Sequence, residues 1–466
     1  MNDDNAARRV IQELRAHVTA AAPGARLPSV RDLMARHHIS PVTAQRAIRR
    51  LASEGLVEVR PGKGSYVAAR VTGVTEVADL SWQAVALGER RSGEDALPEL
   101  LAMPRPELIT LTAGYLDAAL QPVNALGAAL SRAARRPSAW ERGPVEGRLE
   151  LRAWFARQAG GALRAGDMVV CPGGQSGLGT VLRALCVPGD TVLVEAPTYL
   201  GVMAAARTFG LRVVGVPVDA DGVRPDLLAA AFERTGARVF YCQPAYANPH
   251  GAVLAPHRRA EVLAAARAAR AFILEDDWAR DLVLEGEHPP PLVAEDLHGH
   301  VVHLRSLTKA GAPGLRVAAI GARGAAGARI RSARVADDFF VSGPLQEAAL
   351  EFVASPAWAR HQRTLRTELL ARRDALLSAL ARHLPELTLA VVPRGGLHLW
   401  ARLPDGVDDQ ALTTAAAAHG VVVFPGRPWY PAEPPAPHLR LTFGAAAPEV
   451  LGEGVRRLAA AYATLR

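Results

Sequence analysis

Lysine is almost absent from this 466-residue chain: among its 54 basic residues only Lys63 and Lys309 are not arginine. Either residue type can supply a surface charge, an ion pair or a phosphate contact. Only lysine can supply a primary amine that loses its proton and attacks a carbonyl carbon. The two lysines are therefore the first positions at which to look for chemistry.

Cysteine is scarce too, with Cys171, Cys186 and Cys242 only. They are too few and too scattered for a disulfide framework, and no pair has metal-ligand spacing, so we expect neither a stapled secreted domain nor a metal site. Long apolar runs are also missing: no uninterrupted stretch could span a bilayer, and the opening MNDDNAARR lacks the apolar core of a signal peptide. These absences indicate a cytoplasmic protein that does not enter a membrane.

Net charge is concentrated at one end of the chain. Residues 1–70 contain twelve Arg and Lys against six Asp and Glu, so they carry most of the total formal charge of +8. Nucleic acid is the commonest partner for such an asymmetry. The length favours two or three domains and excludes a single small binding module.

The basic N-terminal segment has the pattern of three helices followed by a hairpin. Apolar residues recur on one helical face over 10–18, a second helix begins after Ser29 with Asp32 three residues on, and a third begins at Pro41. LVEVRPGKGSYVA then predicts two short strands around a turn. This order is typical of a winged helix-turn-helix whose third helix suits the major groove; the alternative is a small helical protein-interaction module.

The stretch RLPSVRDLMARHHISPVTAQRAIRRLASEGLVEVRPGKGSYV resembles the DNA-binding domain of the GntR regulator family almost end to end. Many relatives have arginine where this chain has Pro41, so we assign no operator sequence. The resemblance implies that the residues near double-stranded operator DNA are Arg31, Ser40, Thr43, Gln45 and Arg46, with Lys63 in the wing close to phosphate.

Residues 71–105 have little periodicity, many charges and several Pro or Gly breaks, apart from a short helical pattern at SWQAVAL. We interpret them as a linker that Trp82 partly ties down. Further along the chain, apolar strands alternate with long helices, which predicts an α/β domain with a mostly parallel sheet and ligands at the carboxyl ends of its strands. The predicted strands are DMVVC, TVLVEAP, RVVGVPV, RVFYCQP, FILEDD and VVHLRS.

Polar groups follow several of these strands. VVCPGGQSGLG presents the N–H groups of Gly174 and Gln175 at a helix N-terminus that could receive a phosphate, although an ordinary strand-to-helix turn fits equally well. Tyr199 lies just past one strand end, where its ring could stack on a ligand or fill the core, and Asn248 lies between turn-forming residues after another strand. The acidic residues from Glu275 to Asp277 end a third strand, where they could form a solvated loop or supply a buried carboxylate.

SLTKAGAPGLR places Ser306 and Thr308 before Lys309, with Arg316 seven residues after it. Hydroxyls, an amine and a guanidinium, together with the upstream glycine turn, fit one phosphorylated aldehyde that is bound covalently. Pyridoxal 5'-phosphate (PLP) is such a compound, because its chemistry needs a lysine aldimine, a carboxylate for the pyridinium nitrogen and a phosphate cup.

The order of these segments resembles the fold-type I PLP-dependent aminotransferases. The resemblance implies an α/β transferase-like fold, with a mostly parallel sheet plus a small α+β domain that contains GGLHLW, and it matches HLRLTFG to the segment whose arginine binds a substrate carboxylate. The implied roles are Lys309 for the aldimine, Asp276 for the ring nitrogen, Tyr199 for stacking, Asn248 for the ring hydroxyl, Gly174, Gln175, Ser306 and Arg316 for the phosphate, and Arg440 for a substrate carboxylate.

A GntR domain joined to such a body is the arrangement of the MocR-type transcriptional regulators. The resemblance implies a winged helix-turn-helix domain at 1–70, a linker at 71–105 and a PLP-binding domain at 106–466. It further implies a homodimer that binds operator DNA and senses a small amine or amino acid through aldimine chemistry at Lys309.

Two positions depart from the family pattern. Trp278 stands where a tyrosine usually donates to the cofactor's ring oxygen, and Arg142 replaces an aromatic residue five positions before Gly147, although Trp140 is near. Both changes remove groups that tune the cofactor, so we expect a regulator with little or no turnover. The alternatives are an active PLP-dependent aminotransferase with a GntR-type domain, and a regulator whose cofactor pocket is vestigial or senses only the vitamer.

Overall fold

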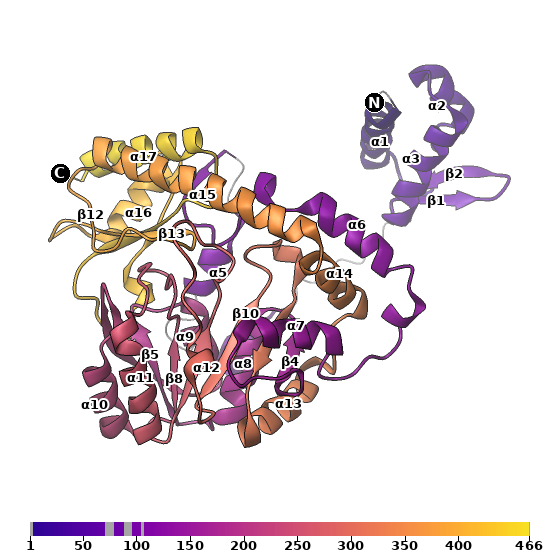
Figure 1. Cartoon of the computed structure of the whole chain (residues 1–466). Coiled ribbons are helices and arrows are strands. Elements are labelled where there is room, and N and C mark those ends of the chain that lie inside the picture. Colours follow the sequence, from indigo (N-terminus) through magenta and orange to yellow (C-terminus); the bar gives the residue numbers. More distant parts are fainter. Residues whose placement is uncertain (1–2, 70–78, 88–95, 104–106, 466) are drawn as a thin grey trace. The chain divides into compact units, whose positions relative to one another are not determined.

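The chain forms two compact units, residues 1–90 and 91–466 (Figure 1). The computed structural model describes residues 3–69, 79–87, 96–103 and 107–465. Parts of the predicted linker at 71–105 therefore lie outside the described residues. In the part of the chain that is described, no helix is long and apolar enough to cross a bilayer, and no group of three or more His, Cys, Asp or Glu side chains is placed to hold a metal ion.

The N-terminal unit begins with three helices and a hairpin, as the sequence predicts. Ser29 starts the second helix through a capping box, since its Oγ accepts the Asp32 N–H at 3.2 Å and the Asp32 carboxylate accepts the Ser29 N–H at 2.9 Å. Apolar side chains of all three helices form one small core, and the hairpin extends from them (Figure 1). The elements are α1 (Asp3–Ala20), α2 (Val30–His37), α3 (Pro41–Ser53), β1 (Val57–Arg60) and β2 (Gly64–Val67).

Two short helices lie in the interval that the sequence predicts to be a linker. The first, α4 (Ser81–Leu87), covers the predicted pattern SWQAVAL, but Trp82 is 61% exposed and does not anchor it. The second, α5 (Ala96–Leu101), packs Leu97 and Leu100 against the core of the larger unit. The anchoring side chains are therefore leucines that come later in the chain.

The larger unit is built on an eight-stranded sheet in the order β4-β11-β10-β9-β8-β5-β6-β7. Neighbouring strands from β10 to β6 run parallel, whereas β11 and β7 run antiparallel to their neighbours. All six predicted strands are present, which confirms the α/β fold with a mostly parallel sheet. The strands are β4 (Met168–Cys171), β5 (Thr191–Ala196), β6 (Arg212–Asp219), β7 (Gly222–Val223), β8 (Val239–Cys242), β9 (Phe272–Asp276), β10 (Val301–Ser306) and β11 (Ala318–Gly321).

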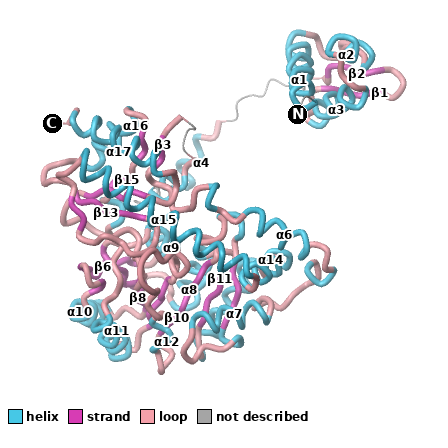
Figure 2. Tube along the Cα trace, turned by 45° about the horizontal axis from the view of Figure 1, so that its top comes forward, coloured by secondary structure: helices cyan, strands magenta, loops and turns pink. Residues whose placement is uncertain are grey.

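Alternate side chains of these strands enter two separate apolar cores, one with Leu193 and Ile273 and the other with Val192 and Leu274. Successive side chains of a strand point to opposite faces, so helices cover both faces of the sheet. In Figure 2 the strands β8, β10 and β11 lie among these helices. The helices are α6 (Val123–Ala133), α7 (Leu149–Ala159), α8 (Gly174–Leu185), α9 (Leu200–Thr208), α10 (Pro225–Thr235), α11 (Pro256–Ala268), α12 (Leu292–Glu295), α13 (Gly324–Asp338) and α14 (Gly343–Val353).

A smaller α+β part completes the unit. Its four-stranded antiparallel sheet has the order β12-β13-β16-β15, and β14 pairs in parallel with β3 from the start of the body. The predicted GGLHLW and HLRLTFG segments supply its two central strands. The elements are β3 (Ile109–Thr110), α15 (Pro356–His383), β12 (Thr388–Leu389), β13 (His398–Arg402), α16 (Asp409–Ala418), β14 (Val421–Val422), β15 (Phe424–Pro425), β16 (His438–Thr442) and α17 (Pro448–Ala463).

Candidate functional site

One cavity gathers side chains from the carboxyl ends of the central strands and from the N-terminus of α8. Every residue that the sequence predicts to bind the cofactor lines this cavity, although the residues lie far apart in the chain. The lining consists of Tyr115, Gly174, Gln175, Leu178, Tyr199, Gln243, Asn248, Asp276, Trp278, Ser306, Thr308, Lys309 and Arg316.

Lys309 follows β10 by three residues and is held inside the cavity. Its Nζ donates a hydrogen bond to the Gly114 carbonyl at 2.7 Å and lies 4.0 Å from the centroid of the Tyr115 ring. Burial, and next the positive charge of Arg440, lower the pKa of Lys309 to about 7. A large fraction of the amine is thus neutral near neutral pH, which is the nucleophilic form.

Asp276 is the last residue of β9. Its Oδ2 accepts hydrogen bonds from the Tyr241 hydroxyl at 2.7 Å and from Gln243 Nε2 at 2.9 Å. Burial raises the pKa of Asp276 although both donors act in the opposite direction. A buried carboxylate of this kind suits a cationic N–H partner such as a pyridinium. The sequence predicts Asp276 but neither of its two donors.

The turn before α8 brings a guanidinium to the helix N-terminus. Gly173 has φ +101°, and a Cβ there would lie 2.3 Å from Arg316 Nη2, so only glycine leaves room for the arginine. Arg316 Nη2 donates to the Pro172 carbonyl at 2.9 Å. Gly174 and Gln175 are the first two residues of α8, whose opening N–H groups have no partner within the helix. A guanidinium beside free N–H groups suits a phosphate.

Tyr199 and Asn248 lie on two loops that meet the same cavity. The Tyr199 hydroxyl donates to Gln175 Oε1 at 3.2 Å. The Asn248 N–H donates to Gln243 Oε1 at 2.8 Å, while Asn248 Oδ1 accepts from Arg440 Nη1 at 3.3 Å. Gln243 therefore connects Asp276 to Asn248.

Arg440 lies on β16 and reaches the site through Asn248 without lining the cavity. It is 1% exposed, donates to the Thr112 carbonyl, and its guanidinium carbon lies 4.5 Å from the centroid of the Trp429 ring. Burial lowers the pKa of Arg440 to about 9. A buried guanidinium with few anionic neighbours has capacity to bind a carboxylate.

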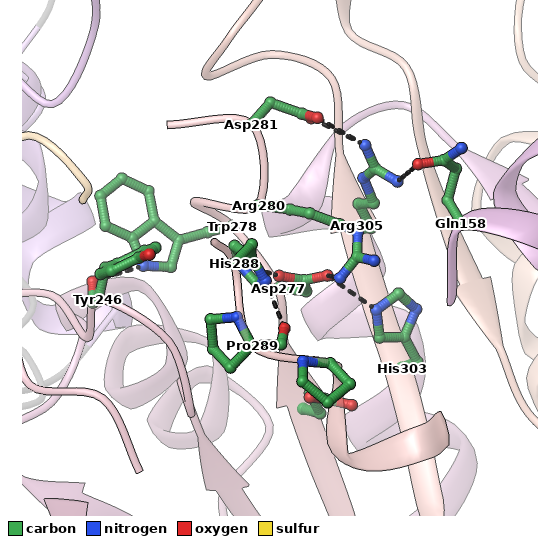
Figure 3. A network of polar contacts seen from close by, with 12 residues as sticks. Gln158, Tyr246, Asp277, Trp278, Arg280, Asp281, His288, Pro289, His303 and Arg305 are labelled. Carbon is green, nitrogen blue, oxygen red and sulfur yellow. Dashed lines mark hydrogen bonds and ion pairs between the residues drawn. The ribbon is translucent and has the colours of Figure 1, made fainter. Parts of the chain in front are cut away.

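The single N–H of Trp278 is bonded to Tyr246, which does not line the cavity (Figure 3). The indole Nε1 donates to the Tyr246 carbonyl at 3.2 Å, and the ring stacks on His398 with centroids 5.7 Å apart. At the other departure from the family pattern, Arg142 and Trp140 are both exposed. The Trp140 indole donates to the Ala134 carbonyl at 2.9 Å.

A polar network supports the chain just beyond β9, where Asp277 and Trp278 lie (Figure 3). The Asp277 carboxylate lies within 3.4 Å of a side-chain nitrogen of Arg280, His288 and His303. Burial raises the pKa of Asp277, but the hydrogen bond with His303 and the charges of its neighbours outweigh that effect and lower the pKa. The carboxylate therefore stays charged and holds the chain just beyond β9.

Of the residues predicted to approach DNA, all but Thr43 are exposed, and their contacts with a duplex stay a prediction. Arg31, Gln45, Arg46 and Lys63 are exposed, whereas Thr43 is 5% exposed and its Oγ1 lies 2.8 Å from Ser40 Oγ. Ser40 Oγ also accepts the Thr43 N–H at 3.1 Å. The structure thus gives this pair a helix-capping role and places Thr43 inward, which corrects the expectation that its side chain faces a duplex.

Family models match both units. The model for aminotransferase class I and II covers residues 106–458, and the model for bacterial regulatory proteins of the gntR family covers residues 6–67. The chain belongs to the aminotransferase class I and II family. With its GntR domain it has the two-part architecture of MocR-type GntR regulators, which confirms the resemblance seen in the sequence. The cofactor of this family is PLP, and the cavity around Lys309 has the amine, carboxylate and phosphate-binding groups to receive it.

The chain is similar to full-length regulators. It is 26% identical to the HTH-type transcriptional regulator YdfD of Bacillus subtilis over 93% of this chain and 91% of that protein. It is 28% identical to the HTH-type transcriptional regulator YdcR of Escherichia coli over 90% and 91%.

Solved aminotransferases share the fold of the body. The α-aminoadipate aminotransferase LysN of Thermus thermophilus, complexed with N-(5'-phosphopyridoxyl)-L-leucine, has a TM-score of 0.75 and 27% identity over 83% of this chain and 99% of its own. The kynurenine aminotransferase of Pyrococcus horikoshii has a TM-score of 0.76 and 26% identity over 84% and 99%.

Proposed function

We propose that this protein is a PLP-dependent DNA-binding transcriptional regulator that senses a small amine or amino acid at Lys309. The observation that carries the proposal is the convergence of all eight predicted cofactor-binding residues on one cavity, in a chain that also has a GntR domain. PLP supplies an aldehyde that captures amines. The protein supplies the binding, the orientation and the surrounding charge.

Each side chain has a task that its surroundings support. Lys309 would hold the cofactor covalently through its side-chain nitrogen, and the cofactor would supply the carbon at which an effector amine can replace that nitrogen. Asp276 keeps a proton on the ring nitrogen. Arg316 and the N-terminus of α8 hold the phosphate. Arg440 binds the carboxylate of an amino-acid effector, in exchange for its contact with Asn248.

A homodimer is part of the proposal. The segment 123–149 and the residues just before α14 expose large apolar side chains, and α6 packs against α14. Exposed large apolar side chains support an interaction site, and a two-fold dimer would also pair two DNA-binding domains on two half-sites. The exposed side chains are Val123, Leu130, Trp140, Leu149, Phe339 and Phe340. Sedimentation of the PLP-bound protein as a monomer would contradict this part.

DNA fragments that flank the protein's own gene provide the test. We expect the full-length, PLP-bound protein to bind at least one fragment, and an amine from a panel of amino acids and small amines to change its affinity. Protein stripped of PLP should not respond to the same amine. Arg440→Ala should lose the response to amino acids and keep the response to amines without a carboxylate.

An active aminotransferase is the second candidate, favoured by the likeness to solved aminotransferases and by an intact set of cofactor-binding side chains. The two candidates differ in turnover. Under the regulator proposal, keto-acid product stays below one equivalent per protein. Accumulation through many rapid turnovers would instead support the enzyme.

A further inference from the structure

A second cleft lies between the large sheet and the four-stranded sheet, away from Lys309. Its volume is about 480 Å³, which is within the range of pockets that bury small ligands. One wall comes from the ends of β5 and β6 and the loop after β8, the other from β13 and β16. The two walls include Pro197, Asp219 and His250 on one side and Trp400, Arg402 and His438 on the other.

The small-domain wall is aromatic and flat. The Trp400 and His438 rings stack with centroids 4.8 Å apart and an interplanar angle of 9°. Tyr430 also lines the cleft, with its ring centroid 6.3 Å from that of Trp400. Aromatic side chains in a cleft wall favour a flat aromatic ligand, which they can contact by offset stacking or by their edges.

The charges at the rim favour an anionic group on that ligand. Arg402 is exposed. Among the described residues its one ion pair is with Asp405, whose Oδ1 lies 2.8 Å from Arg402 Nη2. Such an exposed pair is weak, so a ligand carboxylate can compete for the guanidinium. On the opposite wall, the Asp219 carboxylate is neutralised by both terminal nitrogens of Arg258, at 2.6 and 2.9 Å.

His250 adds a polar group to the large-domain wall. Its Nδ1 accepts the Ala252 N–H at 3.3 Å, and burial lowers its pKa to about 4, so the ring is neutral with its proton on Nε2. This buried Nε2 is without a hydrogen-bond partner among the described residues. Buried donors in proteins are normally satisfied, so an acceptor on a bound molecule would complete the wall.

We propose that this cleft is a second ligand site and that it binds an aromatic carboxylate. The ring lies along the Trp400 and His438 wall, the carboxylate pairs with Arg402, and a ring heteroatom or carboxylate oxygen reaches toward His250.

The cleft shares its supports with the cofactor cavity. Trp400 pairs with Arg440 in the register of β13 and β16, and Trp429 contacts both, with its ring 6.4 Å from Trp400 and 4.5 Å from the Arg440 guanidinium. On the other wall, His250 comes two residues after Asn248 and Pro197 two residues before Tyr199. An occupant would therefore change the affinity for the effector, and the effector would change the affinity for the occupant by the same factor. This coupling rests on the proposed function, whereas binding in the cleft does not.

Indole-3-acetate is a suitable probe, because it has no amino group to exchange with Lys309. Its dissociation constant is measured by calorimetry on the full-length, PLP-bound protein and on variants that fill the cleft from opposite walls, Ala436→Trp and Ala220→Trp. We expect an increase of at least about tenfold in each, because the new side chain takes the place of the ring. Arg402→Ala should weaken the probe by about fivefold and leave neutral indole-3-acetamide unchanged, and Arg382→Ala, at the exposed end of α15, should alter neither.

Unchanged affinity in both filled variants overturns the proposal. If the filled variants bind normally and Arg440→Ala loses binding, the proposal is also overturned, because the probe would then occupy the cofactor cavity. The visible absorption of bound PLP reports on folding and on Lys309 in every variant. Absence of that absorption in the unmodified protein would count against the proposed function alone, since the cleft binds its probe without the cofactor.

Discussion

Lys63 and Lys309 illustrate how differently the two units present their functional groups. Lys63 is exposed in the turn between β1 and β2, whereas Lys309 is buried and its Nζ is fixed on the Gly114 carbonyl. An exposed charge acts on DNA phosphates at long range and is screened by salt. A buried amine acts on one atom, and its reactivity is set by the groups packed around it.

The same contrast extends to the neighbours of each lysine. In the N-terminal unit, Arg31 and Arg46 project from separate helices into solvent, so their contributions to binding should be nearly additive. In the cavity the side chains share partners: Gln243 bonds both Asp276 and Asn248. The effects of substitutions in the cavity should therefore be strongly coupled, whereas those in the N-terminal unit should add.

The largest expected effect is at Lys309. Lys309→Ala should abolish covalent attachment of PLP, because the chain has no other lysine apart from the exposed Lys63. Absorption spectra of the purified proteins, and mass spectra after borohydride reduction, measure the attachment. Lys63→Ala is the matched control and should carry PLP normally. A visible band that persists unchanged in Lys309→Ala would refute the assignment.

The next effect concerns DNA. Arg46→Ala should reduce discrimination between operator and unrelated duplex by about 1–3 kcal/mol, as expected for loss of a base contact. Lys63→Ala should weaken both duplexes alike and lower the slope of log K against log salt by about 1. Fluorescence anisotropy at several salt concentrations separates the two. Equal loss on both duplexes in Arg46→Ala would assign that arginine to the backbone instead.

The sequence predicted much of the cofactor cavity because its chemistry depends on residue types that have few substitutes. Lys309 is one of two lysines in the chain. Asp276 and Asn248 lie at or after apolar segments that are recognisable as strands from their sequence. Tyr241 and Gln243 were missed because, within RVFYCQP, they read as an aromatic core residue and a loop residue. Only the packing of β8 beside β9 shows that both donate to Asp276.

Other features depend on tertiary contacts that no local pattern reports. β11 has the sequence Ala-Ala-Ile-Gly, in which only Ile320 has a strong preference for strands, and it interrupts the parallel order of the sheet. Thr43 lies on the predicted helix, but its orientation depends on the cap that it forms with Ser40. The second cleft forms only where the two sheets come together. In the sequence, the aromatic residues of its wall therefore cannot be distinguished from ordinary core residues.

The surroundings of Lys309 also predict a pH dependence. Only the neutral amine attacks an aldehyde, and the pKa of Lys309 is lowered from 10.5 to about 7. The rate at which stripped protein attaches PLP should therefore rise with pH through about 7 and level off above it. For an exposed lysine, the rate of attachment would still increase above that pH. Arg440→Gln removes a charge that lowers this pKa, so its midpoint should move to higher pH. Stopped-flow absorption measures both profiles, and a rate still rising steeply above pH 9 would contradict the burial argument.

The smallest expected effect is at Trp278, and it is a shift in a spectroscopic midpoint. A tyrosine at this position could donate a hydrogen bond from its hydroxyl to the ring oxygen of the cofactor. That bond would stabilise the negative charge on the oxygen, and so favour loss of the proton from the nitrogen that joins PLP to Lys309. The indole N–H is already used on the Tyr246 carbonyl. In Trp278→Tyr the pH midpoint of the visible band should fall by about one pH unit, the size of one hydrogen bond to a charged group.

Trp278→Phe is the control that isolates the hydroxyl. Phenylalanine can stack on His398 as the indole does, but it has no donor, so its midpoint should not fall. An equal fall in both variants would mean that ring size, and not the hydrogen bond, sets the midpoint. Because Trp278 does not supply this donor, we expect the linking nitrogen to stay protonated to higher pH and to remain open to exchange with an incoming amine. The later proton transfers need closely placed acid and base groups and should be slow. The tryptophan at position 278 therefore favours amine capture without repeated turnover. A turnover assay on the unmodified protein and on Trp278→Tyr shows whether the tyrosine increases the rate of transamination.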